Sequence, residues 1–252
     1  MSVCVVTGGG GPRIGNGICR ALVGKGWSVV VADLDLAAAE GVVEELRAAG
    51  GVAVPVALDV TDVESVRTCV AAAVGEFGRI DAWVNSAGVG LRKDGAEATP
   101  EEFDRLHAIN YRGPWTCIRE VLPVMVENGG GSIVNIGSVH AAGAAETFTL
   151  YAATKAALTA LTRGIAQDYG RRGIRCNIVQ PGAVESRGNA HLLDEFVATR
   201  QMLPTAVESI DIGNAVAFLL SAEARAITGV ELFVDAGTTA MLFERDASGR
   251  RM

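Results

Sequence analysis

The sequence predicts an α/β fold in which one doubly wound parallel β-sheet carries helices on both faces. Short β-branched apolar runs alternate with longer helical patterns along the chain, which is typical of successive β-α-β units. Of the 252 residues 49% are hydrophobic, enough for a sizeable core, and 31 Gly imply many tight turns. No Pro/Ser-rich linker or internal repeat divides the sequence, so we expect residues 1–252 to form a single domain.

The first half of the chain contains four strand signals with helical patterns between them. Apolar runs of strand length cover Val3–Thr7, Ser28–Ala32, Val52–Leu58 and Ile80–Val84. Helices are expected from Ile14 to about Gly24, over Leu36–Ala48, and from Thr61 to about Phe77. Asp35 before the second helix and the capping-box pattern Thr61–Glu64 before the third predict where these helices begin.

The second half continues the alternation. A capping-box pattern at Thr99–Glu102 opens a helix that we expect to reach about Glu127, with Pro114 kinking one turn. Three more strands and two more helices are predicted: Ser132–Ile136, Ile174–Val179 and Glu231–Val234, and Tyr151–Gln167 and Asp211–Leu220. Residues 186–206 carry mixed charge, and we interpret them as a mobile helical flap; residues 238–252 are expected to form a tail.

Composition argues against several classes of protein. The net charge is −7 without a Lys/Arg-rich run, which argues against nucleic-acid binding. Residues 1–7 lack the features of a signal peptide, and no run of 18 apolar residues predicts a membrane span. Five scattered Cys without a Cys-x-x-Cys pair predict reduced thiols in a cytoplasmic protein. Three His without ligand spacing (His107, His140, His191) give no reason to expect a metal site.

A glycine-rich stretch, residues 8–17, separates the first strand from the first helix. Strand, glycine loop and helix form the geometry that lets backbone N–H groups approach a pyrophosphate at a helix N-terminus. Asp33 follows Gly15 by 18 positions, near the spacing of about 20 expected for an acid that binds a dinucleotide ribose. The alternatives are a flexible turn for the loop and a turn or cap role for Asp33. A carboxylate here repels a 2′-phosphate, so we expect NAD rather than NADP.

Tyr151 and Lys155 stand four positions apart in an Ala-rich helical segment, and therefore share one face of the helix. An ammonium near a phenol favours the phenolate, so we expect Lys155 to lower the pKa of Tyr151 from about 10. The phenol could then donate and accept a proton near neutral pH. The alternative is a solvated pair on an amphipathic helix.

Further motifs follow the predicted strands, and their order and spacing are specific as a set. The sequence as a whole resembles the short-chain dehydrogenase/reductase family, whose members have a Rossmann fold. The matches are Thr7-Gly8 with Ile14-Gly15, Asp59-Val60, Asn85-Ser86-Ala87-Gly88, Asn110, Ser138, Tyr151-x-x-x-Lys155, Pro181-Gly182-Ala183-Val184-Glu185-Ser186 and Val234-Asp235-Ala236-Gly237.

The resemblance implies the roles of the site residues. Tyr151 would be the general acid/base, and Lys155 would lower its pKa and hold the nicotinamide ribose. Ser138 would orient the substrate oxygen, and Asn110 would hold a water that relays protons from Lys155. The cofactor-binding set would be Gly8, Arg13, Ile14, Gly15, Asp33, Asp59, Val60, Asn85, Ala87, Gly88, Tyr151, Lys155, Pro181, Val184 and Ser186.

Two positions depart from the family pattern. The loop from Gly8 to Gly15 is one residue too long, with Arg13 in place of a middle glycine; an alternative alignment uses Gly11, Gly15 and Gly17. We expect Gly15 to be the last motif glycine and Arg13 to touch a phosphate. Ser86 replaces a second Asn, which should perturb a strand-end hydrogen bond more than the chemistry.

The expected activity is hydride transfer between NAD(H) and a secondary alcohol or ketone. One alternative is a 3-oxoacyl thioester reductase; another is a catalytically silent dinucleotide-binding sensor or scaffold. The resemblance implies a homo-oligomer, most often a tetramer, and small residues on the Tyr151 helix favour close subunit contacts: Ala152, Ala153, Ala156, Ala157 and Ala160. No sequence signal identifies the substrate.

Overall fold

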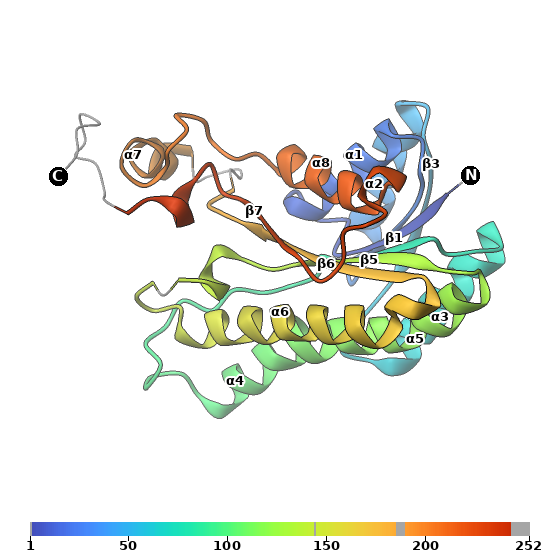
Figure 1. Cartoon of the computed structure of the whole chain (residues 1–252), viewed down its shortest axis with the longest axis horizontal. Helices are drawn as coiled ribbons and strands as arrows, with labels where there is room; N and C mark the ends of the chain where they lie inside the picture. Colours follow the sequence, from blue (N-terminus) through green and yellow to red (C-terminus); the bar gives the residue numbers. More distant parts are fainter. Residues whose placement is uncertain (1, 144, 185–189, 243–252) are drawn as a thin grey trace.

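The structure is a computed structural model that describes residues 2–143, 145–184 and 190–242. Seven parallel strands form one sheet in the order β3-β2-β1-β4-β5-β6-β7 (Figure 1). The strands are β1 (Val3–Thr7), β2 (Ser28–Asp33), β3 (Val52–Ala57), β4 (Ala82–Asn85), β5 (Gly131–Ile136), β6 (Ile174–Pro181) and β7 (Glu231–Val234). The predicted doubly wound parallel sheet is therefore confirmed.

Helices cover both faces of this sheet (Figure 1). One face packs against α1 (Ile14–Gly24), α2 (Leu36–Ala48) and α8 (Ser209–Leu220). The other face packs against α3 (Val63–Phe77), α5 (Gly113–Glu127) and α6 (Thr149–Tyr169). Alternate residues of β1 supply the two cores, Cys4 and Val6 to the first and Val3 and Val5 to the second, because successive strand side chains point to opposite faces.

The chain reverses its direction of winding between β1 and β4. From β1 it moves outward through β2 to β3, and then returns to place β4 on the other side of β1. At such a switch point the loops after the two neighbouring strands diverge, which leaves a crevice at the carboxyl edge of the sheet. The glycine loop after β1 and the Asn85–Gly88 segment after β4 therefore border the same space.

Two helix starts show which capping predictions hold. Thr99 and Glu102 form the predicted capping box at α4 (Pro100–His107). The prediction that Thr61 opens the third helix is wrong, because Asp62 is the cap and accepts the Glu64 N–H at 3.1 Å. The Thr61 hydroxyl instead donates to Asp59 at 2.7 Å. An aspartate one position nearer the helix takes the capping role.

The predicted long helix from residue 100 to 127 is divided in two. A π-helical segment, Ala108–Arg112, joins α4 to α5, and Pro114 stands in the first turn of α5. Pro114 has no N–H to donate and its ring crowds the preceding turn, so the backbone widens just before it. The predicted kink is thus a π segment, and Asn110 lies at its centre.

The segment predicted to be a flap contains α7 (Ala190–Arg200), while residues 186–189 lie outside the described part of the chain. A parallel bridge between Val184 and Val207 joins the two sides of this segment. In the predicted tail, residues 238–240 form a short 3₁₀ turn, and residues 243–252 are likewise outside the description. None of the described helices is long and apolar enough to cross a membrane.

Candidate active site

A cavity of about 1350 Å³ opens at the carboxyl edge of the sheet. It is lined by most residues that the sequence assigned to the site: Gly8, Arg13, Ile14, Gly15, Asp33, Asp59, Val60, Ala87, Gly88, Ser138, Tyr151, Lys155, Pro181 and Val184. Asn85 and Asn110 are not among the lining residues, and Ser186 lies outside the described residues. Residues from seven separate segments thus meet in one space.

Lys155 is buried beneath the cavity, with 6% of its surface exposed. Its Nζ donates a hydrogen bond to the Ile136 carbonyl at 2.8 Å, at the end of β5. The same Nζ lies 5.7 Å from the centroid of the Tyr151 ring, so the two side chains share the face of α6 that the spacing predicts. Burial lowers the pKa of Lys155 to about 8, because the charged form loses hydration.

The pKa of Tyr151 does not follow the sequence prediction. Burial raises it above its ordinary value of 10, and a hydrogen bond with Ser138 opposes that shift. The expectation that Lys155 lowers this pKa below 10 is therefore wrong for the protein without cofactor. Removing the phenolate from water outweighs the stabilisation that the Ser138 hydrogen bond gives it.

Gln180, which the sequence analysis did not single out, holds Ser138 in place. Its Oε1 accepts the Ser138 N–H at 2.6 Å, while its Nε2 donates to Thr159 at 3.0 Å and to Glu231 at 2.9 Å. A Cβ on Gly137 would lie 2.0 Å from Gln180 Oε1, so only glycine fits beside this amide. The serine is thus positioned through its backbone by a fully buried side chain on the neighbouring strand.

Asn110 holds the loop that follows β4. Its Oδ1 accepts the Val89 N–H at 2.9 Å, and its Nδ2 donates to the Val89 carbonyl at 2.8 Å and to Thr154 at 3.3 Å. A Cβ on Gly88 would lie 3.3 Å from Asn110 Oδ1 and 3.6 Å from Lys155 Nζ. The asparagine and the lysine are therefore close neighbours on either side of a residue that lines the cavity.

Asn85, expected to line the adenosine side, belongs instead to the core. Its Oδ1 accepts the Trp83 Nε1–H at 2.9 Å, and its Nδ2 donates to Asn135 at 2.8 Å. Asn135 in turn donates to the Thr162 hydroxyl at 2.9 Å. The side chain of Asn85 makes its hydrogen bonds within this buried network. The next residues along the chain, Ser86–Gly88, line the cavity, whereas Asn85 does not.

The glycine loop is closed by contacts that a side chain would disrupt. A Cβ on Gly15 would lie 2.0 Å from the Gly8 carbonyl oxygen, and a Cβ on Gly17 would lie 2.4 Å from the Ser209 backbone, so both alignments of the motif place glycine where only glycine fits. Asp33 accepts the Gly10 N–H at 2.9 Å and thereby ties the loop to β2. Arg13 stands at the N-cap position of α1 and lines the cavity.

After β4, the departure at Ser86 leaves the strand end intact. The backbone N–H groups of Ser86 and Ala87 both donate to the Thr7 hydroxyl at 3.1 Å. The side chain at position 86 has no part in either bond.

Tyr151 belongs to a cluster of three aromatic rings that border the cavity, with His140 and Phe148. His140 stacks on Phe148 with centroids 4.4 Å apart, and both rings meet Tyr151 edge-on, at 5.9 Å and 6.0 Å. Arg92 lies over the outer side of the cluster, 5.8 Å from the Phe148 centroid. Neither Phe148 nor Arg92 was singled out from the sequence, because each belongs to a loop without a periodic pattern.

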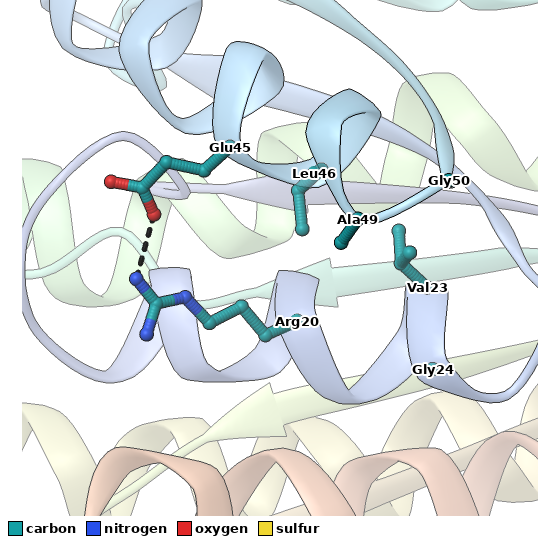
Figure 2. A pocket seen from close by; sticks show the side chains of 8 residues that line it. Arg20, Val23, Gly24, Glu45, Leu46, Ala49 and Gly50 are labelled. Atoms are coloured by element: carbon teal, nitrogen blue, oxygen red, sulfur yellow. Dashed lines mark hydrogen bonds and ion pairs between the residues drawn. The ribbon is translucent and has the colours of Figure 1, made fainter.

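A smaller cavity of about 450 Å³ lies between α1 and α2 (Figure 2). Its lining is mainly aliphatic and glycine, and its two charged groups, Arg20 and Glu45, pair with each other at 2.6 Å. It is bordered by the C-terminal ends of both helices, which in β-α-β units lie at the amino edge of the sheet. This cavity is therefore remote from Tyr151 and offers no unpaired group for chemistry.

Comparisons with known proteins agree with this geometry. A family model described as enoyl-(acyl carrier protein) reductase matches residues 12–239. A 2,5-dichloro-2,5-cyclohexadiene-1,4-diol dehydrogenase of Sphingobium indicum is 34% identical over 238 residues, 93% of this chain and 95% of the relative. A 3-oxoacyl-[acyl-carrier-protein] reductase of Staphylococcus aureus is 32% identical over 241 residues, 94% of this chain and 98% of the relative.

Solved structures show the same similarity. A short-chain dehydrogenase/reductase from Burkholderia xenovorans superposes with a TM-score of 0.91 at 34% identity, covering 95% of this chain and 97% of that one. A gluconate 5-dehydrogenase from Burkholderia cenocepacia, in complex with NADP and tartrate, gives 0.90 at 30% identity, covering 96% of both chains. The chain described here belongs to the short-chain dehydrogenase/reductase family, and it is an NAD(P)-dependent oxidoreductase.

Proposed function

We propose that the protein interconverts a secondary alcohol and its ketone, with Tyr151 as the general acid/base. The observation that carries this proposal is the convergence of Ser138, Tyr151 and Lys155 on one cavity at the carboxyl edge of the sheet. The nicotinamide cofactor, when bound, supplies or accepts the hydride. The residues of the chain bind, orient the substrate oxygen and move the proton.

The glycine loop at the cavity is suited to the pyrophosphate of a dinucleotide. Gly8 and Gly15 approach each other so closely that no side chain can stand between them, and a backbone without side chains at the start of α1 allows a pyrophosphate to come close. Lys155, Val184 and Pro181 line the opposite side, where we propose that the nicotinamide end is held. Ser186 was assigned there as well, on the strength of the resemblance.

NAD is the proposed cofactor, with NADP disfavoured by Asp33 at the end of β2. A carboxylate there accepts ribose hydroxyls and repels a 2′-phosphate. Arg13 lines the same cavity, and a guanidinium that reached a 2′-phosphate would offset that repulsion. Measured kcat/KM for the two cofactors tests this, and a preference for NADP that Asp33→Ala leaves unchanged would contradict it.

Proton transfer follows from the positions of three side chains. In ketone reduction Tyr151 donates its phenolic proton to the substrate oxygen, and in alcohol oxidation the phenolate accepts it. Ser138 hydrogen-bonds the phenol and opposes the rise in its pKa that burial causes, while Lys155, with a pKa of about 8, lies 5.7 Å from the Tyr151 ring. We expect alcohol oxidation to rise with pH as the phenol ionises and ketone reduction to fall. Asn110, close to Lys155, is the proposed holder of a proton-relaying water.

The test is Tyr151→Phe, which keeps the ring and removes the proton. We expect kcat to fall by about 10²–10⁴-fold, with cofactor affinity nearly unchanged. Cofactor fluorescence confirms binding, and circular dichroism confirms folding. Turnover within about threefold of the parent would refute the mechanism.

Reduction of 3-oxoacyl thioesters is the second candidate, favoured by the similarity to the Staphylococcus aureus reductase. Acetoacetyl-coenzyme A and simple ketones, assayed side by side, separate the two. A silent sensor or scaffold is the remaining alternative, and binding of cofactor without turnover of any substrate would support it.

We further propose a homo-oligomer, a tetramer by family resemblance. Ala153, Ala156 and Ala160 are exposed on α6, where small residues permit a second helix to approach closely. Light scattering at micromolar concentration should give a multiple of 26.1 kDa, and the monomer mass would exclude it. The proposed compartment is the cytoplasm, since all five Cys are buried free thiols.

The described part of the flap, residues 190–206, is proposed to close over bound cofactor. It follows the carboxyl edge of β6 and is joined at its base by the Val184–Val207 bridge. Hydrogen exchange should slow there on cofactor addition. Unchanged exchange, with binding established separately, would count against closure.

A further inference from the structure

Arg92 lies at the edge of the cavity with no acidic partner among the described residues. The next residue, Lys93, pairs with Glu102 at 2.9 Å, so this loop does supply a carboxylate to one of its two cations. The chain as a whole carries a net charge of −7. An unpaired guanidinium beside the active site is therefore not a consequence of a generally basic surface.

The position of Arg92 is fixed by a strained neighbour. Its Nε donates to the Thr147 hydroxyl at 3.4 Å, and the Lys93 N–H donates to the Thr147 carbonyl at 2.7 Å. Thr147 has a φ of 66°, in the left-handed region that a β-branched residue rarely adopts. Strain of this kind persists only where the surroundings enforce it, and it gathers at functional sites.

One aromatic ring separates Arg92 from the reacting phenol. The guanidinium lies 5.8 Å from the Phe148 centroid, and that centroid lies 6.0 Å from the Tyr151 ring. Burial lowers the pKa of His140, the third ring of the cluster, which is therefore neutral at neutral pH. The wall of the site between Tyr151 and Arg92 is thus aromatic and uncharged, and a formal positive charge stands at its outer end.

The other arginines that line the cavity are placed differently. Arg13 is on the glycine loop, Arg105 is on α4, and Arg112 adjoins Gly113, whose Cβ would lie 2.9 Å from Val60. Arg13 and Arg112 therefore stand beside residues of the expected cofactor-binding set, Ile14 and Val60. Arg92 is the described arginine that contacts the aromatic cluster of Tyr151.

We propose that Arg92 binds a carboxylate of the substrate, which makes the natural substrate a hydroxy acid and its oxo acid counterpart. A guanidinium carries its N–H groups in its own plane, so a ring over one of its faces leaves them able to bind a carboxylate with two parallel hydrogen bonds. The carbinol carbon would lie at Tyr151 and Ser138, with the intervening chain against Phe148. The inference rests on the proposed alcohol–ketone activity at Tyr151.

The experiment compares acids with their methyl esters. The probes are 3-hydroxybutanoate, 4-hydroxypentanoate and 5-hydroxyhexanoate, each with its ester, assayed for kcat/KM with saturating cofactor. The wild-type protein should prefer at least one acid over its ester by about tenfold or more, through KM. Arg92→Ala should abolish that preference and leave the ester unaffected, and Arg92→Lys should restore part of it.

Arg172→Ala is the matched control. Arg172 is also exposed and stacked, 5.0 Å from the Tyr169 centroid, but it lies beyond the far end of α6, about 30 Å from Tyr151 by helix rise. It should leave the acid-to-ester ratio unchanged.

A second readout needs no turnover. Binding of 4-oxopentanoate and of its methyl ester to the complex of the protein with NADH is titrated by cofactor fluorescence. Tighter binding of the acid that disappears in Arg92→Ala supports the proposal even where no probe is oxidised. Equal binding of acid and ester by the wild-type protein overturns it, as does an Arg92→Ala variant that loses both equally. Alcohol turnover without any acid preference would overturn the substrate class and leave the proposed function standing.

Discussion

Lys155 and Arg92 are two cations at one cavity that the protein holds in opposite ways. Lys155 is buried, donates to the Ile136 carbonyl, and has its pKa lowered to about 8. Arg92 is exposed, and an aromatic ring and one long hydrogen bond hold it. Burial lets the protein adjust a proton affinity, whereas exposure keeps a charge accessible to a ligand. The floor of the site, where Lys155 lies, is thus suited to chemistry, and the edge of the site, where Arg92 lies, is suited to the proposed recognition of substrate.

The largest effect is expected on the floor. Lys155→Ala should lower kcat/KM by about 10³-fold and weaken cofactor binding as well, because in the proposed mechanism one side chain serves both the phenol and the ribose. Arg92→Ala should change only the KM of acids. Steady-state kinetics with cofactor titration distinguishes the two patterns, and Lys155→Ala with normal cofactor affinity would remove the ribose role.

The next effect concerns stability beneath the floor. Asn135→Ala leaves the buried Nδ2 of Asn85 without its partner and removes one of the two hydrogen bonds of the Thr162 hydroxyl, and we expect a loss of about 3 kcal/mol in the free energy of unfolding. Asn128→Ala, at an exposed helix end, should cost less than about 0.5 kcal/mol. Urea denaturation measures the free energy of unfolding of both variants. Equal losses would show that the buried network does not contribute more to stability than an exposed side chain.

A smaller effect should appear in the pH dependence of stability. Folded Lys155 has a pKa of about 8 against 10.5 in its ordinary state, so between these values the unfolded chain binds more protons. Stability should therefore rise with pH from about 8, by at most about 1.4 kcal/mol per unit. Burial raises the pKa of the Cys thiols, whose opposite contribution begins near pH 9. The free energy of unfolding, measured between about pH 7.5 and 9, should therefore depend on pH with a different slope in the wild-type protein than in Lys155→Met. Parallel curves for the two proteins would contradict the prediction.

The smallest effect is expected at the edge. Thr147→Gly relieves the left-handed strain and loses the hydrogen bonds of the exposed hydroxyl with Arg92 and with the Glu146 carbonyl, so stability should stay within about 0.5 kcal/mol while the acid preference falls about twofold to threefold. Ala236→Gly, at the other described non-glycine residue with positive φ, is the control. It should leave substrate preference unchanged; a matching loss there would point to a general effect of added flexibility.

The sequence predicted the floor better than the edge, for a physical reason. Tyr151 and Lys155 are linked by helix periodicity, and Ser138 follows a strand, so local pattern places all three. Gln180 could not be found this way, because its role depends on the Ser138 N–H, 42 positions away and on another strand. Arg92 and Phe148 meet only because two irregular loops cross, and neither loop has a repeating pattern.

Asn85 and Tyr151 show where local reasoning fails even for well-placed residues. The position of Asn85 at a strand end was correct, but its side chain points into a hydrogen-bond network that only the packed sheet reveals. The raised pKa of Tyr151 likewise depends on burial, which the spacing of Tyr151 and Lys155 does not report.

Gln180 also connects the centre of the sheet to its margin. Its amide joins Ser138 to Glu231 on the edge strand β7, and Glu231 pairs on the surface with Arg163. Edge strands ordinarily tolerate substitution, since few partners depend on them. Here the acid on β7 supports, through Gln180, the serine that we propose orients the substrate oxygen. Evolutionary drift at positions 180 and 231 should therefore be coupled, with a change at one restricting which residues remain acceptable at the other.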